Sequence, residues 1–160
     1  MSTLLEHLDR QVESSRRLLG IVLSQGKAIR GRDVEGVLAK LAELQAELLQ
    51  RAQLETERDG ILRDASSRLG LPVEQVDLEA VLELEPSVET AGQARALSAE
   101  LKGLVAETGR LHEQNRVLLR QELSFLDHLM RVLSGVPQAG YTPNGFGSTP
   151  QLVNALDARA

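Results

Sequence analysis

The chain has 160 residues, of which 42% are apolar, so it is long enough for one folded domain with or without an appendage. It contains no cysteine, which excludes disulfides and thiolate metal sites, and its net charge of −5 does not favour a polyanionic partner. Leu, Ala, Glu, Gln and Arg predominate and aromatic residues make up only 2%. This composition is typical of long helices and predicts an all-α fold.

The sequence also limits where the protein works. Its first residues, "MSTLLEHLDR", include acidic side chains and lack the apolar run of a secretory signal. No stretch approaches the roughly 18 consecutive apolar residues that cross a bilayer. No basic stripe is present that would follow a nucleic-acid backbone. We therefore expect a cytoplasmic protein without membrane insertion and without nucleic acid as a partner.

The first predicted helix runs from about Ser2 to Ile29. Its apolar positions follow a 3-4-3-4-3 spacing, which places them in one narrow seam on a helix. The residues of this seam are Leu5, Leu8, Val12, Ser15, Leu19 and Val22. Gly26 and Gly31 are interpreted as stop signals, and Asp33 as the N-cap of the next helix.

The second predicted helix runs from Asp33 to about Leu69, where "LGLP" has the Gly-then-Pro order of a helix end. Its middle, "RAQLETERDG", is nearly all polar, so this waist either crosses solvent or faces a thin part of a bundle. Residues 1–32 carry an excess of basic side chains and residues 33–86 an excess of acidic ones. This asymmetry suggests that the two helices are antiparallel neighbours, although surface ion pairs stabilise only weakly.

A short helix is predicted around Val76 to Leu84, stopped by Pro86, and Ser87 is expected to cap the longest helix, which reaches about Ser134. At 1.5 Å per residue, about 48 residues span roughly 70 Å. The expected fold is therefore an elongated antiparallel bundle of three long helices plus one short helix, with a flexible C-terminal tail. Residues 1–134 form the predicted helical domain, and residues 135–160 the Gly/Pro-rich tail. The seam of the longest helix comprises Ala94, Leu97, Leu101, Leu104, Thr108, Leu111, Asn115, Leu118, Glu122, Phe125, Leu129 and Val132.

Three polar residues, Thr108, Asn115 and Glu122, fall on this seam seven residues apart. Either the seam drifts and they lie at the rim of the bundle, or Asn115 is buried and fixes the register of the helices.

No catalytic motif is found. "GIVLSQGKA" resembles a phosphate-binding loop, but its glycines are one residue too far apart and Ala28 stands where a metal-binding hydroxyl is required. None of the three histidines belongs to a Glu-x-x-His pair of the kind that holds a di-iron centre, and all three are expected at solvated or rim positions. We expect a protein that is not an enzyme and that holds neither a metal nor a cofactor.

The C-terminal part carries a family resemblance. Residues 111–146 read "LHEQNRVLLRQELSFLDHLMRVLSGVPQAGYTPNGF", in which Asn115-Arg116, a leucine pair, Phe125 and a Tyr141-x-x-x-Gly145 tail follow one another. This order resembles the FlgN family of flagellar type III export chaperones. "GRDVEGVLAKLAELQAELL" is similar to the start of that family's second helix, and "LGLP" to its end. The resemblance covers roughly residues 4–147.

The resemblance implies a chaperone that binds the C-terminal helical segments of the hook-associated proteins, which form the hook-filament junction. It would prevent their premature assembly and deliver them to the export gate and the export ATPase complex. The residues assigned to cargo are Asn115, Leu118, Leu119, Leu126, Leu129 and Met130. Leu118, Phe125 and Leu129 are expected in the inner seam, and Leu119, Leu126 and Met130 form a second stripe shifted by about 100°.

The resemblance implies that Tyr141 and Phe146 dock on the export gate, and the Gly and Pro residues around them disfavour helix and strand. The alternative is that these two aromatic side chains fold back and cap the bundle. The last segment, "STPQLVNALDARA", extends past the family pattern and is either disordered or covers the cargo groove. A coiled-coil scaffold or tethering subunit without export cargo remains the alternative function. A chaperone of a virulence secretion system is a further one, for which strands are expected.

Overall fold

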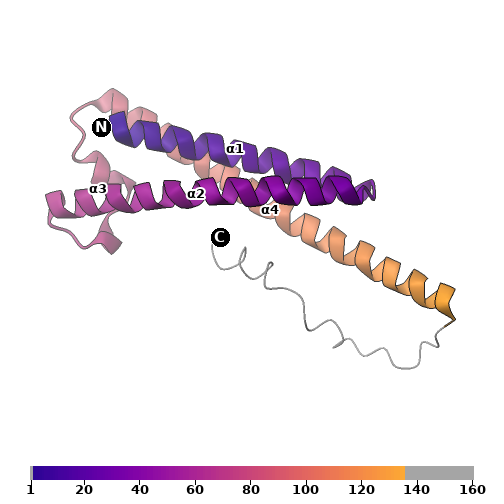
Figure 1. Cartoon of the computed structure of the whole chain (residues 1–160). Coiled ribbons are helices and arrows are strands. Elements are labelled where there is room, and N and C mark those ends of the chain that lie inside the picture. Colours follow the sequence, from indigo (N-terminus) through magenta and orange to yellow (C-terminus); the bar gives the residue numbers. More distant parts are fainter. Residues whose placement is uncertain (1, 136–160) are drawn as a thin grey trace. The chain divides into compact units, whose positions relative to one another are not determined.

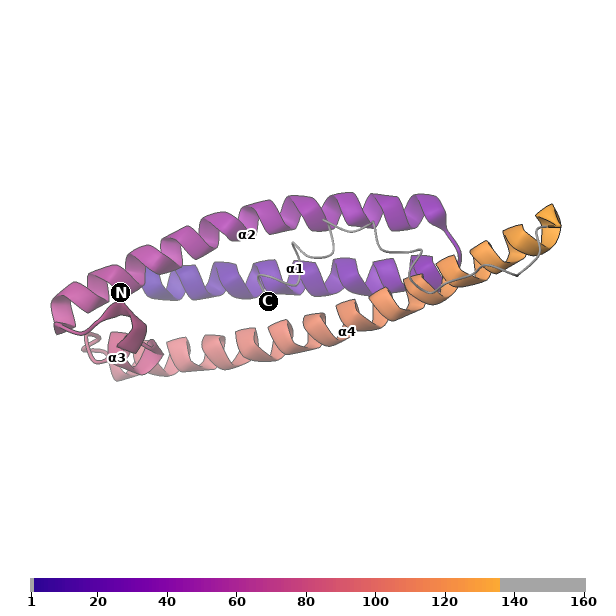
Figure 2. The same ribbon diagram turned by 90° about the horizontal axis from the view of Figure 1, so that it is seen from below.

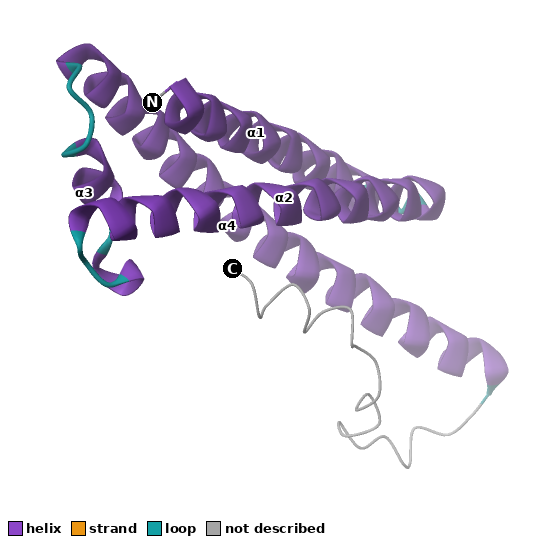
Figure 3. Ribbon diagram, turned by 60° about the vertical axis from the view of Figure 1, so that its left-hand side comes forward, coloured by secondary structure: helices purple, strands orange, loops and turns teal. Residues whose placement is uncertain are grey.

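The computed structural model describes residues 2–135, and every regular element in that part of the chain is a helix (Figure 1, Figure 3). The predicted all-α fold with three long helices is therefore confirmed. The elements are α1 (Ser2–Arg30), α2 (Val34–Leu69), the short 3-10 helix η1 (Val73–Gln75), α3 (Leu78–Leu82) and α4 (Val88–Ser134).

The two ends of α2 lie where the sequence predicts them. The side chain of Asp33 accepts a hydrogen bond from the backbone N–H of Gly36 at 3.0 Å, which satisfies one of the free donors of the first turn. At the other end, Gly70 has a φ of 68° and its N–H donates to the carbonyl oxygen of Ser66. This left-handed conformation is one that glycine adopts without a steric penalty.

The region between α2 and α4 is more divided than predicted. The expected helix from Val76 to Leu84 is present but shorter, as the five-residue helix α3, which Asp77 caps by accepting from the N–H of Ala80 at 2.9 Å, and η1 precedes it. Ser87 caps α4 as predicted.

The interpretation of Gly26 as a stop signal is wrong. Helix α1 continues through it to Arg30, and the turn follows at residues 31–32. Gly26 is buried, so its lack of a side chain serves the packing of α1 against a side chain of α4 rather than helix termination.

The chain forms two compact units, residues 1–115 and residues 116–160, and α4 contributes to both. Each unit is described separately. The predicted division into residues 1–134 and 135–160 stays a prediction, because nearly all of the tail lies outside the described residues.

In the first unit, α1 and α2 lie side by side in antiparallel order (Figure 1, Figure 2). Two ion pairs join their facing sides: Arg10 binds Glu57 through two hydrogen bonds of 3.0 and 2.6 Å, and Arg17 binds Glu47 through two of 3.0 Å. The predicted pairing of a basic first helix with an acidic second one is therefore confirmed.

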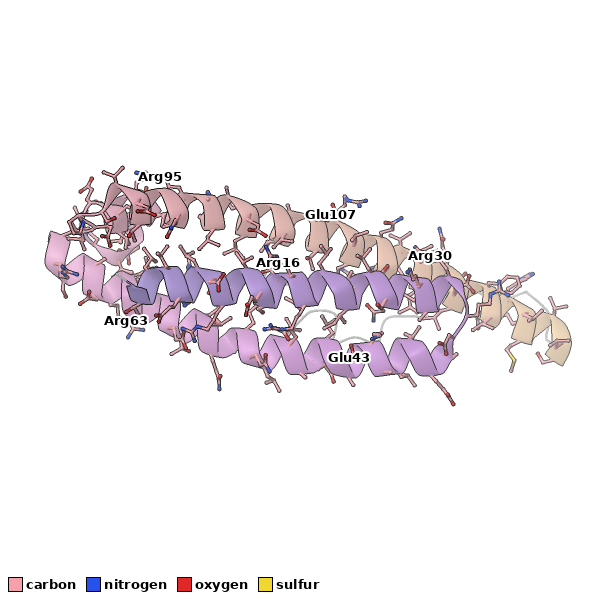
Figure 4. All side chains as sticks on the ribbon, turned by 90° about the horizontal axis from the view of Figure 1, so that it is seen from above. Arg16, Arg30, Glu43, Arg63, Arg95 and Glu107 are labelled. Carbon is pink, nitrogen blue, oxygen red and sulfur yellow. The ribbon has the colours of Figure 1, made fainter. Side chains whose placement is uncertain are left out.

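Apolar side chains gather in two clusters within residues 1–115. The larger one lies at the end of α1 that faces α3, and it is centred on Leu4, Val81 and Ala94, the last of which is fully inaccessible. The smaller one joins Leu18 and Val22 of α1 with Leu44 of α2, and Leu111 of α4 packs against it. Figure 4 shows Arg95 near the α3 end, where its guanidinium holds Glu79 of α3 at 2.7 Å.

Between the two clusters the contact of α1 with α2 is polar. Arg51, in the polar waist of α2, donates to the hydroxyl of Ser15 at 3.1 Å, and Leu54 nearby is buried. The waist therefore does not cross solvent. It faces a stretch of α1 in which polar side chains are themselves buried: His7, Gln11, Ser14 and Ser15.

The expectation that all three histidines are solvated is wrong for His7. Its side chain is 5% exposed, and its ring nitrogens lie 3.4 Å from a Glu57 carboxylate oxygen and 3.5 Å from the Gln11 amide. The reason is that α1 packs against both α2 and the first part of α4. A helix covered on two sides buries a wider arc than the single heptad seam that the sequence indicates.

Candidate functional site

Asn115, the last residue of the first unit, binds α1 from α4. Asn115 is 5% exposed, and its side-chain amide donates to the backbone carbonyl oxygen of Val22 at 2.8 Å. A Cβ atom placed on Gly26 would lie only 2.7 Å from the Oδ1 atom of Asn115. Of the two alternatives for Asn115, burial in the helix contact is the one that the structure supports.

The other two polar seam residues differ from Asn115. Thr108 is half-buried and its hydroxyl donates to the carbonyl oxygen of Leu104 in its own helix at 2.7 Å, which needs no partner from another helix. Glu122 is half-buried in the second unit. The rim interpretation therefore suits Thr108. Glu122 lies one turn after Leu118 and one turn before Leu126, on the apolar side of its helix.

In the second unit, residues 116–134 of α4 carry apolar side chains on half of the helix circumference, and Glu122 is the charged residue within that half. At 100° per residue, these side chains cover an arc of roughly 180°. A helix that packs against a single neighbour needs a narrower stripe. The apolar residues of this arc, named here the apolar half of α4, are Leu118, Leu119, Leu123, Phe125, Leu126, Leu129, Met130, Val132 and Leu133.

The apolar half of α4 is largely open to solvent. Leu126 is 51% exposed and Met130 66%, as expected for the second stripe. The expectation that Phe125 and Leu129 form a covered inner seam is wrong, because they are 47% and 40% exposed, and only Leu118 is half-buried. The heptad continues past Asn115 in sequence, but a periodic pattern does not reveal where a covering helix ends.

The opposite side of the same segment is polar except for Val117. Asp127 and Arg131, one turn apart, form an ion pair of 2.9 Å, and Arg120, Ser124 and His128 lie on this side as well. This contrast between the two halves makes residues 116–134 strongly amphipathic. Contiguous exposed apolar surface of this kind marks an interaction site.

Two members of the apolar half were missed by the sequence reasoning. Leu123 and Leu133 are exposed and lie on the same side as Leu119, Leu126 and Met130. Leu123 precedes Met130 by seven residues and Leu133 follows Leu126 by seven, so the heptad spacing was the signal that could have identified them. The predicted docking residues Tyr141 and Phe146 lie outside the described residues.

Glu47, in the first unit, is a buried group whose pKa is shifted. Burial raises the pKa of the Glu47 carboxyl, but the hydrogen bonds and charge of Arg17 and the charge of Arg51 outweigh it, so its pKa lies below the ordinary value. Glu47 contacts α1 from α2 and thus links the helices. A carboxylate held ionised by two guanidinium groups is an ion-pair network rather than a poised acid or base.

Within residues 2–135, no group of three or more His, Asp or Glu side chains is arranged to hold a metal ion. In the same range, no helix is long and apolar enough to cross a membrane.

A family model described as FlgN protein matches residues 1–148. No curated protein and no solved structure matches the chain significantly. The family match covers nearly the whole chain and includes both the helix contact at Asn115 and the apolar half of α4. The chain belongs to the FlgN family, a family of flagellar export chaperones.

Proposed function

We propose that this protein is a cytoplasmic chaperone that binds the C-terminal helical segments of the hook-associated proteins and delivers them to the type III export apparatus. The observation that carries the proposal is the exposed apolar half of α4 in residues 116–134. The family match supports a role in flagellar export in general. The particular cargo is inferred from the sequence resemblance.

Binding follows from the amphipathic character of both partners. A cargo helix that presents an apolar stripe would pack into the apolar half of α4, in the way that amphipathic helices occupy apolar grooves. Each Leu or Met side chain that becomes fully covered contributes about 1.5–3 kcal/mol. The contact residues are Leu118, Leu119, Leu126, Leu129 and Met130. While the cargo helix is covered in this way, its apolar stripe cannot pair with another junction subunit.

The role proposed for Asn115 is at the edge of this surface. Its amide is already engaged with Val22, so its contribution to cargo binding is to hold the start of the segment in place. Direct contact of Asn115 with cargo stays a prediction.

Delivery is assigned to the tail, where Tyr141 and Phe146 would dock on the export gate and bring cargo to the export ATPase complex. In this proposal the chain has no catalytic activity, holds no cofactor and binds no nucleic acid.

The test compares two charged substitutions on opposite sides of one helix. Leu126→Asp places a carboxylate in the apolar half of α4, whereas Ser124→Asp places the same group on the polar side. Affinity for a purified C-terminal segment of a hook-associated protein is measured by titration calorimetry. Leu126→Asp is expected to weaken binding at least about tenfold, the cost of losing a buried leucine contact, and Ser124→Asp to leave it within about twofold.

Circular dichroism of both variants separates binding from folding. Because Leu126 is exposed, the helix content should stay at the wild-type level. If Leu126→Asp unfolds the chain, the apolar half belongs to the core and the cargo assignment fails. If no hook-associated segment binds the wild-type protein, the scaffold alternative replaces the proposal.

A further inference from the structure

Helix α2 carries a second apolar surface on the side that faces away from α1. Val34, Leu38 and Leu49 are 69%, 59% and 74% exposed, although each is a large aliphatic residue. They belong to a stripe that recurs every three or four residues over residues 34–56. The outer stripe of α2 is defined as Val34, Leu38, Leu41, Ala42, Gln45, Leu49, Ala52 and Thr56.

The core of the first unit does not use this stripe. The side chains of α2 that are buried are Leu44, Glu47, Leu54 and Ala65. At 100° per residue, these positions lie roughly 100–180° around the helix from Gln45, the middle of the outer stripe. Only Leu41, at one margin of the stripe, is half-buried. The stripe is thus additional to what the fold needs.

We propose that the outer stripe of α2 pairs with the same stripe of a second copy of this chain, in antiparallel order, about a two-fold axis at Gln45. In this order, Leu38 faces Ala52 of the other copy, Val34 faces Thr56, and Leu49 faces Leu41. Leu38 then meets a small side chain, and Leu41 and Leu49 form an apolar contact on either side of the axis, so that the space between the two helices is filled. A closed pair of this kind uses one surface twice, as two-fold dimers do.

The same pattern disfavours a parallel pair. Parallel order would place Leu38 against Leu38 and Ala42 against Ala42. The two leucines would keep the helices apart, and the two alanines, one turn further along, would then leave an unfilled space. It would also align the two helix dipoles, whereas antiparallel order opposes them. Gln45 at the two-fold axis meets its own copy, and two amide side chains can donate to and accept from each other.

Charge favours a second copy over a charged partner. No member of the outer stripe is charged, and the ion pair of Lys40 with Glu43, at 3.0 Å, lies outside the stripe on the same helix. Two identical stripes therefore meet without bringing like charges together. A strongly basic or acidic partner would find no complementary charge on this surface.

The small size of the stripe favours a reversible dimer. Residues 34–56 span roughly 34 Å of helix. Their exposed side chains supply roughly half of the about 800 Å² per partner that a stable specific interface buries. The pair should therefore be reversible, with a dissociation constant on the order of 10–500 μM.

Sedimentation velocity of the full-length protein over a concentration series tests the association. The wild-type chain should shift from monomer to dimer across the range above. Leu49→Asp should remain monomeric at concentrations at least tenfold higher, with unchanged helix content because Leu49 is exposed. Leu126→Asp, outside α2, should dimerise like the wild type. A chain that stays monomeric at 1 mM overturns the proposal, and so does a dimer abolished by Leu126→Asp but kept by Leu49→Asp.

Disulfide trapping tests the antiparallel order, since the chain has no cysteine of its own. Gln45→Cys places two thiols at the two-fold axis, where an S–S bond can form if the Cα atoms come within about 7 Å. Ala52→Cys is the matched control on the same stripe. In antiparallel order its two copies are separated by roughly 21 Å along the helix axis, whereas in parallel order they face each other.

Under mild oxidation, Gln45→Cys should form the covalent dimer at least about tenfold faster than Ala52→Cys. Equal rates, or a faster Ala52→Cys, contradict the antiparallel pair. The outer stripe could instead be occupied by cargo. In that case a hook-associated segment would block trapping at Gln45→Cys, and Leu49→Asp would weaken binding of that segment. Both results together would overturn the dimer proposal. That result would leave the proposed chaperone function intact, so the two proposals can fail separately.

Discussion

The side chain of Asn115 and the backbone of Gly26 lie against each other where α4 meets the C-terminal part of α1. The Asn115 amide donates to the Val22 carbonyl oxygen at 2.8 Å, and its Oδ1 atom occupies the space that a Cβ atom on Gly26 would enter, at 2.7 Å. The hydrogen bond and the missing side chain therefore depend on each other.

This relationship predicts that Gly26→Ala changes the free energy of unfolding in opposite directions in the wild-type chain and in an Asn115→Ala variant. In the wild-type chain, Gly26→Ala should displace the Asn115 amide and lower the free energy of unfolding by about 1–2 kcal/mol. In an Asn115→Ala background the obstacle is gone, so Gly26→Ala should raise it by up to about 1 kcal/mol through helix propensity. Urea denaturation of the four proteins in the cycle measures both. Additive effects would mean that the two residues do not interact.

A second prediction concerns the ion pair between Glu47 and Arg17. Because the folded-state pKa of Glu47 lies below its ordinary value of 4.5, its contribution to stability is present above that pH and is lost as the pH falls below it. Glu47→Gln should lower the free energy of unfolding by about 1–2 kcal/mol at pH 7, since the charge-assisted bonds from Arg17 are lost.

Thermal unfolding between pH 7 and pH 3 provides the measurement, and the difference between Glu47→Gln and wild type should shrink below about pH 4.5. Glu43→Gln is the matched control, because Glu43 forms an ion pair with Lys40 on the exposed side of α2, and it should change stability by less than about 0.5 kcal/mol. A constant difference across the pH range would show that the carboxylate charge is not what stabilises the contact.

The third prediction uses two glycines with different backbone conformations. Gly70 has a φ of 68°, so Gly70→Ala should cost about 1 kcal/mol at the end of α2. Gly103 lies within α4, and a Cβ atom added to it would meet no neighbouring group within 4 Å. Gly103→Ala should therefore stabilise the chain by about 0.5–1 kcal/mol. Equal shifts in melting temperature for the two variants would contradict this.

These examples also indicate how far the sequence could predict the fold. The sequence identified three helix caps correctly, at Asp33, Gly70 and Ser87. Capping depends on local backbone geometry, which a few neighbouring residues determine. His7 and Gly26 were misinterpreted because their burial depends on two other helices covering α1. A heptad seam predicts that a helix has a partner, but not how many partners it has.

The candidate site shows the same limit. The leucine spacing in residues 116–134 identified Leu119, Leu126 and Met130 as a separate stripe, and these side chains are exposed. The exposure of Phe125 and Leu129 was not foreseen, because the apolar periodicity of α4 is the same on both sides of Asn115. Which part of a continuous seam is covered is decided by tertiary contacts rather than by the pattern.

The fourth prediction separates carrying cargo from docking. Tyr141→Ala should reduce export of the hook-associated proteins while the melting temperature and the cargo affinity stay near wild type. An aromatic anchor at an interface commonly contributes about 2 kcal/mol, which corresponds to a roughly thirtyfold change in affinity. Gate binding and thermal stability are measured on the same variant. A destabilised protein with normal gate affinity would indicate that Tyr141 caps the bundle instead.

Hydrogen exchange of the full-length protein, with and without a C-terminal segment of a hook-associated protein, tests the central claim most directly. Bound cargo should slow local opening of the helix that it covers. The account predicts slower exchange in peptides from residues 116–134, by about tenfold or more at saturation, with little change in peptides from α1. Protection confined to α1 and α2, with residues 116–134 exchanging as in the free protein, would contradict the assignment of the apolar half of α4 to cargo.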